Sequence, residues 1–382
     1  MRFLFLTPSL EPSHDGVGDY TWRLATQLAN SGHQSACIAL HDRHSGGFME
    51  PHEGEERIPF WRFPAGTPPR ILEARLREIV SVLSPDLVSL QYVPHGFSKH
   101  GMPTRLPGLL SSISGDFTWH LMFHELWIGS LSGENFKRKS IGMVQRMIVR
   151  SLCRRLRPPR IHTSNLFYQR KLWKAGIDSE ILPLFSNIPV STPDPAARSK
   201  LLSDAGISHD SAKVRIVVLF GAIHPEWDPS PLLQEISSVS RPCLILSIGK
   251  VPLRGLPIWN RMIEWASEKL FFSMLGELPA LTISEILHAA DFGATTEASE
   301  LLGKSGTVTA MLEHGLPVIV SRSLGTGETL RDSRFVVIGN KEGESLSGIS
   351  KRPVSESLPA ITSLFIKSIN PSPNRERASD ES

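Results

Sequence analysis

Residues 1–40, "MRFLFLTPSLEPSHDGVGDYTWRLATQLANSGHQSACIAL", decide the fold because they contain one strand, one helix and a second strand in succession. An apolar run, "FLFLT", is followed by a glycine-containing loop, "EPSHDGVG". In "DYTWRLATQLANSGH", one face at helical spacing is formed by Trp22, Leu24, Ala25, Leu28 and Ala29. Gly32 stands where helices commonly end, and "SACIAL" predicts a buried second strand. This order is typical of a parallel α/β sheet.

The same alternation continues along the chain and then begins again. Further helices and strands are predicted in "RILEARLREIVSVLSPDLVSLQYV", "FTWHLMFHELW" and "PRIHTSNLFYQRKLWKAG". A segment rich in proline and serine, "FSNIPVSTPDPAA", predicts a linker. A second series of apolar runs follows, in "VRIVVLFGAI", "PCLILSIG", "FFSMLGEL", "ADFGATT" and "GLPVIVSR".

These two series predict two Rossmann-like domains, over residues 1–188 and 189–352. A length of 382 residues is also more than one ordinary core accommodates. Residues 353–370 are expected to form a closing helix that packs back on the first domain. Residues 371–382 have no apolar face and are expected to be a disordered tail.

The composition is that of a soluble globular protein, with 40% hydrophobic and 21% charged residues and a net charge of +3. Cys37, Cys153 and Cys243 show no zinc spacing and are too few for a disulfide framework, so we expect a reducing cytoplasm. The apolar run at the start is too short for a signal peptide, and no run reaches 18 apolar residues. No metal or cofactor motif is present, and nothing in the small net charge indicates nucleic-acid binding.

Ligands of open parallel sheets bind beyond the carboxyl ends of the strands, and two such positions stand out in the first half. In "DGVGDYTWRLA", Gly16 and Gly18 precede a helix whose first N–H groups suit a diphosphate. A plain tight turn is the alternative, because the full dinucleotide glycine pattern is missing. In "LMFHELW", His124 and Glu125 follow the strand, and His124 suits an acid, a base or a partner of sugar hydroxyl groups. The alternative is a histidine satisfied within its loop.

Two corresponding positions lie in the second half. The loop after "VVLF" carries Gly221, His224, Glu226 and Trp227, which suits either a binding loop or a plain surface turn. In "ELLGKSGTVTAMLEHGLPVIV", Ser305, Gly306 and Thr307 present hydroxyl and N–H groups at the start of a helix, where proteins often bind phosphate. N-capping by Ser305 is the structural alternative. The matching placement of all four positions favours a cleft between the domains.

The quoted segments resemble those of the family 4 glycosyltransferases, which have the two-domain GT-B fold. "GVGDYTWRLATQLANSGHQ" resembles the family's first glycine loop and helix, and "FHELW" stands in place of its His-Asp segment. "PDLVSLQYVPHGF" resembles the third strand and acceptor-side loop, and "LPLFSNIPV" the interdomain junction. "VVLFGAIHPEWDPSPLL" resembles the opening of the second domain, and "LGELPALTISEILHAADFGATTEASELLGKSGTVTAMLEHGLPVIVSR" its donor-binding core. The resemblance extends to about residue 325.

The resemblance implies transfer of a sugar from a nucleotide-sugar to an acceptor, with retention and without an essential metal ion or cofactor. It places the nucleotide mainly on the second domain and gives His124 a hydrogen bond to the donor sugar near the reacting carbon. The donor-binding residues that it implies are Gly16, Val17, Gly18, Gly221, Glu226, Lys304, Ser305, Gly306 and Thr307. The implied acceptor-side residues are Tyr92, His95, Glu125 and Trp127.

The chain departs from the family pattern at the donor site. The family has two glutamates separated by seven residues, and counting back from Gly315 puts Ala310 and Leu302 at these positions. The family's phosphate-binding lysine aligns with Trp227. "GKSGTVTAMLEHG" is closer to a variant that has a basic-Gly-Ser/Thr turn before an Ala-rich helix. In that variant, Lys304 could supply the lost positive charge.

A basic helix is predicted in "NFKRKSIGMVQRMIVRSLCRRLRPPR". Its arginine stripe consists of Arg146, Arg150, Arg154 and Arg157. One interpretation is a core helix with a solvated basic face. The other is docking at the inner face of the cytoplasmic membrane, where each cation contributes about 1 kcal/mol and a lipid-linked acceptor would lie. Nucleic acid is not expected, because no aromatic platform accompanies the stripe.

The leading hypothesis is a hexosyltransferase-like enzyme of bacterial surface polysaccharide or glycolipid assembly. A non-catalytic GT-B protein that binds a sugar nucleotide or a protein partner is the alternative, favoured by the missing glutamates and lysine. A GT-B sugar-nucleotide epimerase is a third hypothesis, weakened because such enzymes need carboxylates in the cleft.

Overall fold

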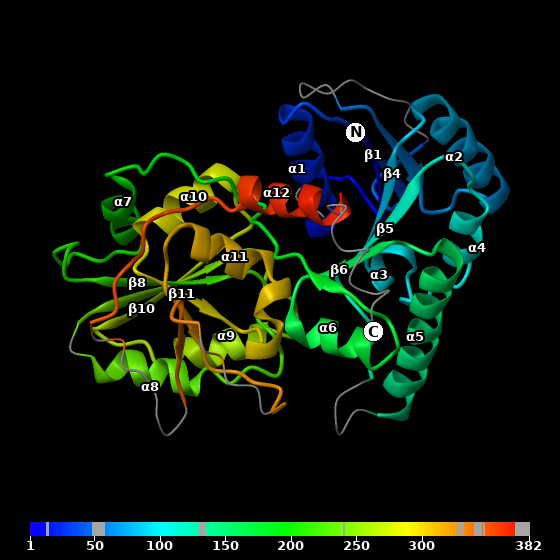
Figure 1. The fold of residues 1–382 in the computed structure, drawn as a ribbon. Helices are drawn as coiled ribbons and strands as arrows, with labels where there is room; N and C mark the ends of the chain where they lie inside the picture. Colours follow the sequence, from blue (N-terminus) through cyan, green and yellow to red (C-terminus); the bar gives the residue numbers. More distant parts are fainter. Residues whose placement is uncertain are drawn as a thin grey trace, which may run out of the picture. The chain divides into compact units, whose positions relative to one another are not determined.

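The computed structural model describes residues 1–12, 15–47, 58–129, 135–239, 241–326, 330, 332–339, 346 and 348–370. The chain divides into two compact units, Met1–Pro183 with Leu358–Ser382, and Leu184–Ser357. Both are parallel α/β units with helices beside the sheet (Figure 1), as the alternating pattern predicts. The tail expected over residues 371–382 lies outside the described residues.

The first unit holds, in its described part, a seven-stranded parallel sheet in the order β3-β2-β1-β4-β5-β6-β7. The strands are β1 (Arg2–Thr7), β2 (Gln34–Asp42), β3 (Phe60–Pro64), β4 (Leu87–Tyr92), β5 (Thr118–Phe123), β6 (Arg160–Thr163) and β7 (Glu180–Ile181). The helices are α1 (Gly16–Asn30), α2 (Pro69–Leu83), α3 (Pro94–Phe97), α4 (Leu106–Ser111), α5 (Phe136–Leu156), α6 (Leu166–Trp173) and α12 (Leu358–Ile369).

The first helix forms as its sequence predicts. Leu24, Ala25 and Leu28 are fully buried against the sheet, while Trp22 is half-buried. Helix α1 ends at Asn30, and Gly32 takes the left-handed conformation with φ +85°. Helix α12 returns to this unit and lies beside α1 (Figure 1). Its Phe365 is fully buried against aromatic rings of the sheet.

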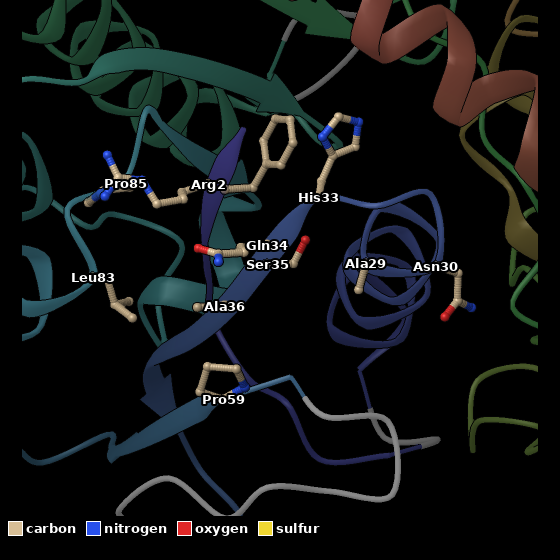
Figure 2. A pocket seen from close by; sticks show the side chains of 11 residues that line it. Arg2, Ala29, Asn30, His33, Gln34, Ser35, Ala36, Pro59, Leu83 and Pro85 are labelled. Carbon is tan, nitrogen blue, oxygen red and sulfur yellow. The ribbon is translucent and has the colours of Figure 1, made fainter.

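A cavity of about 490 Å³ opens at the amino ends of the strands of this unit. Figure 2 shows the starts of β1 and β2 and the end of α1 around it. None of the predicted site residues lines it. Ligands of parallel sheets bind at the opposite, carboxyl edge, so this cavity is not the predicted site.

The second unit holds, within the described ranges, a six-stranded parallel sheet in the order β10-β9-β8-β11-β12-β13. The strands are β8 (Arg215–Phe220), β9 (Cys243–Ile248), β10 (Leu270–Gly276), β11 (Phe292–Thr295), β12 (Val318–Val320) and β13 (Phe335–Val337). The helices are α7 (Ala197–Asp204), α8 (Ser230–Ser238), α9 (Leu256–Ile263), α10 (Ala280–Ala289), a 3₁₀ helix (Ser299–Lys304) and α11 (Gly306–Glu313).

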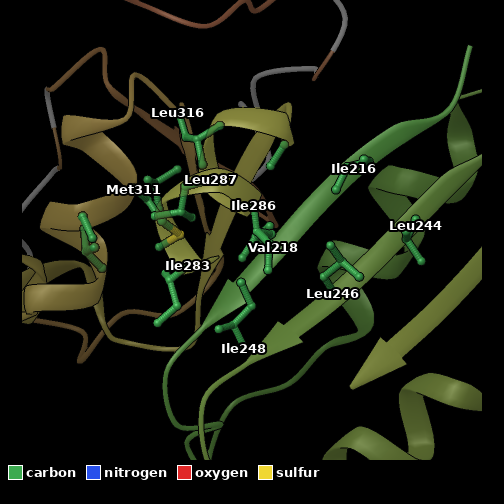
Figure 3. Close-up of a cluster of buried hydrophobic side chains, with 14 of the residues drawn as sticks. Ile216, Val218, Leu244, Leu246, Ile248, Ile283, Ile286, Leu287, Met311 and Leu316 are labelled. Carbon is green, nitrogen blue, oxygen red and sulfur yellow. The ribbon is translucent and has the colours of Figure 1, made fainter. Parts of the chain in front are cut away.

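One core of this unit lies between the sheet and helices α10 and α11. Figure 3 shows Val218 of β8 and Ile248 of β9 near Ile283 of α10, with Met311 of α11 in the same cluster. Strands buried on both faces are expected to be continuous apolar runs, as "RIVVLF" and "CLILSI" are. This packing fixes α11, whose first residues belong to the predicted donor site.

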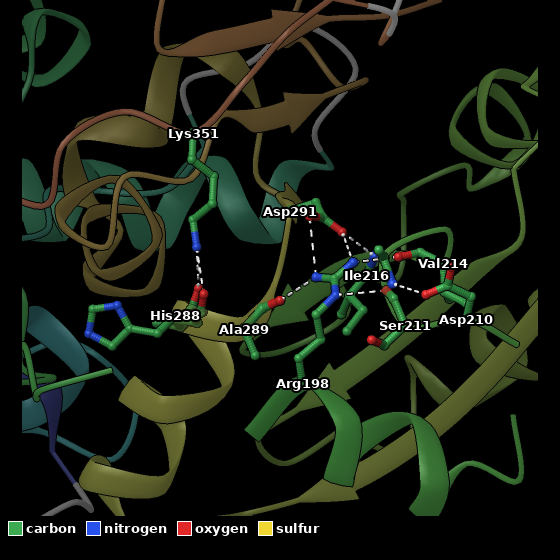
Figure 4. Close-up of polar contacts among 11 residues, drawn as sticks. Arg198, Asp210, Ser211, Val214, Ile216, His288, Ala289, Asp291 and Lys351 are labelled. Carbon is green, nitrogen blue, oxygen red and sulfur yellow. Dashed lines mark hydrogen bonds and ion pairs between the residues drawn. The ribbon is translucent and has the colours of Figure 1, made fainter. Parts of the chain in front are cut away.

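Polar contacts tie the outer helix α7 to the sheet. The Arg198 guanidinium forms an ion pair with Asp291, 3.0 Å between Nη2 and Oδ2, and donates to the carbonyl oxygen of Ala289 at 2.7 Å (Figure 4). Asp291 also accepts a hydrogen bond from the N–H of Ile216 at 2.8 Å. A separate contact holds the end of α10, where the Lys351 ammonium donates to the His288 carbonyl oxygen at 2.7 Å. These contacts fix α7 and the end of α10 relative to the sheet, whose strands carry the loops at the carboxyl edge.

Candidate functional site

The carboxyl edge of the second sheet brings together residues that are far apart in the sequence. Gly221 follows β8 and Gly249 follows β9, both with φ +99°. A methyl group added at Gly249 would lie 3.5 Å from Cα of Gly221. A methyl group added at Gly221 would lie 3.1 Å from Cγ2 of Thr307. The two predicted donor residues Gly221 and Thr307 are therefore neighbours, and glycine keeps the backbone close to the start of α11.

The start of α11 has the features of an anion site. Ser305 is the N-cap, and its Oγ accepts from the N–H of Val308 at 3.4 Å and lies 3.1 Å from Oγ1 of Thr307. The capping alternative is therefore observed. It still leaves the N–H groups of Gly306 and Thr307 in the first turn, where a helix supplies no intrahelical acceptor. An anion at that end would also interact favourably with the helix dipole.

Two cations accompany this helix start. Lys304 ends the 3₁₀ helix directly before Ser305. Arg322 follows β12 and forms an ion pair with Glu226, 2.8 Å between Nη2 and Oε2, with its own side chain only 13% exposed. The pKa of His224 is lowered, chiefly by burial and then by the charge of Arg322; Glu297 and Glu226 oppose this shift, and Lys304 adds a smaller lowering effect. The sequence reasoning missed Arg322, although it stands directly after an apolar strand in "GLPVIVSR".

In the first unit, the glycine loop is already capped by a carboxylate. Asp15 Oδ1 accepts hydrogen bonds from the N–H groups of Val17 at 2.9 Å and Gly18 at 3.3 Å. Burial raises the pKa of Asp15. A methyl group added at Gly18 would lie 2.5 Å from the carbonyl oxygen of Ser9. Gly18 thus permits close backbone packing, and Asp15 occupies N–H groups that were expected to face a diphosphate.

His124 lies directly after β5, as predicted from the end of the apolar strand. It is 6% exposed, and its Nε2 is 2.8 Å from Oε1 of Gln91. Its ring meets that of Tyr20 edge-on, with 4.9 Å between centroids. Burial lowers the pKa of His124 to about 3. At neutral pH, the imidazole is therefore uncharged and suited to hydrogen bonding rather than to acid catalysis.

The residues expected on the acceptor side have different environments. Tyr92 is fully buried and stacks on Phe97, so it packs the core and does not line an acceptor surface as expected. His95 is exposed on α3, and Glu125 is half-buried. Trp127 is half-buried, with the Lys171 ammonium 5.1 Å from the centre of its ring. Three of the four side chains therefore remain available to a ligand.

The loop that carries His124 and Trp127 is held by α5. Gln145 of α5 is fully buried, accepts from the N–H of Ile128 at 3.0 Å and donates to the carbonyl oxygen of Gly101 at 2.9 Å. A methyl group added at Gly142 would lie 1.9 Å from the Ile128 carbonyl oxygen. The sequence predicted α5 as a basic helix that either packs in the core or docks on a membrane, and the structure shows that it also supports this loop.

No protein-family model matches the chain, and no curated protein sequence matches it. Solved structures do match it. An Anabaena protein, Alr3699/HepE in complex with UDP and glucose, is 14% identical, with 97% of this chain and 92% of that chain covered and a TM-score of 0.58. A glycosyltransferase from Rickettsia africae is 14% identical, with 97% and 94% covered and a TM-score of 0.55. Sucrose-phosphate synthase from Thermosynechococcus elongatus is 14% identical, with 96% and 90% covered and a TM-score of 0.58.

The chain has the GT-B fold. This confirms the fold class predicted from the sequence, with two Rossmann-like parallel-sheet units. The level of identity shows the fold, and the membership of family 4 stays a prediction.

In the second unit, core residues fill the positions where the family 4 pattern has charged groups. Leu302 and Ala310, which stand in place of the two glutamates, are buried in the hydrophobic cluster beneath α11. Trp227, in place of the lysine, is buried, and its indole N–H donates to Oγ of Ser321 at 2.9 Å. These side chains stabilise the unit and cannot replace the missing charges.

Glu300, which lies close to the missing acidic pair, is buried and turned toward the loop after β12. Its carboxylate accepts hydrogen bonds from Ser323 Oγ at 2.9 Å, from the Leu324 N–H at 2.9 Å and from Thr326 Oγ1 at 3.1 Å. These donors hold the pKa of Glu300 at about 2 despite its burial. Glu300 is therefore a structural anion of the second unit.

The arginine stripe of α5 is only partly available to a ligand. Arg146 donates to the Lys174 carbonyl oxygen at 3.1 Å, and Arg150 donates twice to the Ala175 carbonyl oxygen, at 3.0 and 3.1 Å. Both therefore hold the end of α6, as cations often do at helix C-termini. Arg154 and Arg157 are exposed. Within the described ranges, no helix is long and apolar enough to cross a membrane, and no cluster of three or more potential metal ligands occurs.

Proposed function

We propose that the chain is a glycosyltransferase that moves a sugar from a nucleotide-sugar to a saccharide or lipid-linked acceptor. The transfer proceeds with retention and without a metal ion, in the cytoplasm. The observation that carries the proposal is the anion site at the start of α11 on the donor unit of a GT-B fold. Similar structures include one in complex with UDP and glucose, which fits a nucleotide-sugar donor.

The diphosphate of the donor binds at the start of α11. The N–H groups of Gly306 and Thr307 donate to it, and the hydroxyl group of Ser305 or Thr307 adds a third contact. Lys304 and Arg322 neutralise its charge in place of the missing lysine. Hydrogen bonds to charged groups each contribute about 1.5–3 kcal/mol, which offsets the freedom that the donor loses on binding.

His124 binds a hydroxyl group of the donor sugar. Its pKa of about 3 keeps the ring neutral at physiological pH, so it does not donate a proton to the leaving group. Its contribution is to orient the sugar in the transition state, which affects kcat more than KM.

A non-catalytic GT-B protein that binds a sugar nucleotide or a protein partner is the second candidate. It is favoured by the apolar core at Leu302 and Ala310, where the family has acidic residues. It is also favoured by Asp15, which occupies the N–H groups of the first glycine loop. This candidate retains donor binding at α11 but predicts no turnover.

Thermal stabilisation and donor hydrolysis with a panel of UDP-, GDP- and ADP-sugars separate the two candidates. The enzyme is expected to be stabilised by one donor class and to hydrolyse it slowly, with the same rate in EDTA. Stabilisation without hydrolysis or transfer to any acceptor would favour the non-catalytic protein that binds a sugar nucleotide. No stabilisation by any donor would exclude the enzyme and leave only a non-catalytic protein that binds a protein partner. His124→Ala is expected to abolish turnover while nucleotide affinity changes within a few-fold, because the nucleotide binds elsewhere.

The same proposal places a lipid-linked acceptor at an anionic membrane surface contacted by α5 and α6. Five large apolar side chains of these two helices are exposed, namely Phe136, Met143, Met147, Leu166 and Trp173. Arg154 and Arg157, near the end of α5, are exposed and supply positive charge. Apolar side chains beside cations are typical of helices that bind the membrane interface.

Flotation with vesicles tests this contact. Wild-type protein is expected to float with vesicles that contain phosphatidylglycerol, and less so in high salt or with phosphatidylcholine vesicles. Met143→Ser with Trp173→Ser is expected to abolish flotation without changing donor hydrolysis. Equal flotation of this variant and of wild-type protein would contradict the membrane contact.

A further inference from the structure

One buried face of the first sheet carries a row of polar side chains. Ser89 and Gln91 lie on β4, His120 on β5 and His162 on β6, and each is at most 1% exposed. Ser89 pairs with His120 in the parallel ladder, and residues two apart on a strand share a face. Strands of a parallel sheet are normally apolar on both faces, so these residues need one another as partners.

The side chains form one continuous chain of hydrogen bonds that ends at His124. His124 Nε2 lies 2.8 Å from Gln91 Oε1, and Gln91 Nε2 donates to Ser89 Oγ at 2.7 Å. Ser89 Oγ lies 2.7 Å from His120 Nδ1, and His120 Nε2 lies 2.8 Å from His162 Nδ1. Four contacts therefore connect the candidate site residue to the inside of the sheet.

One direction of donation along the chain satisfies all of these groups. Gln91 Oε1 can only accept, so the Nε2 of His124 must carry a proton. The Ser89 hydroxyl accepts from the Gln91 amide and keeps one proton, which Nδ1 of His120 at 2.7 Å can accept. His120 is then protonated at Nε2 and donates to Nδ1 of His162. Every member has the donor or acceptor that its neighbour requires.

Burial inside the sheet keeps the histidines of this chain uncharged. Burial keeps the pKa values of His120 and His162 below their usual range, with that of His162 at about 4. The Phe365 ring of α12 packs edge-on against His120, with 5.1 Å between centroids, and also contacts His162. A cationic histidine, which would donate from both nitrogens and break the order, is thereby disfavoured.

We propose that Gln91, Ser89, His120 and His162 are positioning residues that hold His124 as the tautomer protonated at Nε2. Nδ1 of His124 is then the ring atom that accepts a hydrogen bond, so its ligand is a hydroxyl group that donates. This ligand assignment rests on the proposed function, in which the hydroxyl group belongs to the donor sugar. The tautomer itself depends only on the chain of side chains.

Long-range ¹H–¹⁵N NMR of the ¹⁵N-histidine-labelled full chain tests the proposal, since ring ¹⁵N shifts distinguish the two tautomers. His124, His120 and His162, assigned from single histidine variants, are expected to be neutral and protonated at Nε2 at pH 7. Gln91→Met removes the acceptor and is expected to convert His124 to a mixture of tautomers. Met122→Leu, at the position of β5 that pairs with Gln91, is the matched control and is expected to change no tautomer.

The kinetics of donor hydrolysis test whether the tautomer of His124 affects turnover. In Gln91→Met, kcat for donor hydrolysis is expected to fall about 10–100-fold with KM within about 3-fold, because an orienting contact is lost. If Gln91→Met does not fold, Ser89→Ala breaks the same chain one step further away, and Ser89→Thr is expected to restore it.

An unchanged His124 tautomer in both Gln91→Met and Ser89→Ala would overturn the proposal, as would protonation of His124 at Nδ1 in wild-type protein. A changed tautomer with unchanged kcat would overturn the functional assignment of Nδ1. If wild-type protein turns over no donor, the proposed function fails, while the NMR spectra still decide whether the chain fixes the tautomer.

Discussion

Replacing Glu300 by glutamine should destabilise the second unit in a pH-dependent way. A folded pKa of about 2 against a usual value near 4.3 corresponds to about 3 kcal/mol at 1.36 kcal/mol per pKa unit. Solvent screening at the open side of the loop reduces the expected loss to about 2 kcal/mol. Because the folded pKa is lowered, this stability is fully present above about pH 5 and disappears as the pH falls toward 2.

Urea-dependent hydrogen exchange of β8 and β11 measures this effect within the second unit. Glu300→Gln should lower the free energy of unfolding by about 2 kcal/mol at pH 7 and by about 1 kcal/mol at pH 3, where the carboxylate of the unfolded wild-type chain is largely protonated. Glu297→Gln is the control, since Glu297 is half-buried and should change stability by less than about 0.5 kcal/mol. A loss that is equal at both pH values would refute the role of the Glu300 charge.

Two further substitutions test the packing that supports the first unit. Phe365→Ala should lower the free energy of unfolding, measured in urea titrations, by about 3–5 kcal/mol. Leu364→Ala, at a half-exposed position, is the control and should lower it by less than about 1 kcal/mol. Similar losses in the two variants would contradict the packing of α12. Gly142→Ala should lower the free energy of unfolding by about 1–3 kcal/mol and reduce donor turnover, because the added methyl group meets the backbone of Ile128. Gly108→Ala is the control, and it should be neutral or stabilising because there is open space around Gly108. Unchanged stability and turnover in Gly142→Ala would show that the loop yields freely.

The fold was largely predictable from the sequence because each central strand is an apolar run followed by a helical pattern. The run in β1 and the face of α1 formed by Leu24, Ala25 and Leu28 are local features, as is the helix-ending Gly32. The short edge strands β3, β7 and β13 were not predicted, since their burial patterns are mixed or too short to give a periodic signal.

The candidate site was predictable only in part. The end of β5 placed His124 correctly, and the start of α11 at Gly306 was also predicted. The partners of these residues depend on strand pairing and loop packing over long sequence distances. Ser89 and His120, for example, meet because β4 and β5 are neighbours in register. Local spacing likewise could not show that Arg150 binds the end of α6.

Hydrogen-exchange protection by a nucleotide-sugar tests the central claim most directly. With the donor that stabilises the protein, protection is expected at the loop after β8, at the start of α11 and at the residues after β12, which include Gly221, Thr307 and Arg322. Lys304→Ala with Arg322→Ala should weaken this protection and the donor affinity about 10-fold or more, because two charges near the diphosphate are lost. Donor-dependent protection that leaves these three segments unchanged would contradict the account.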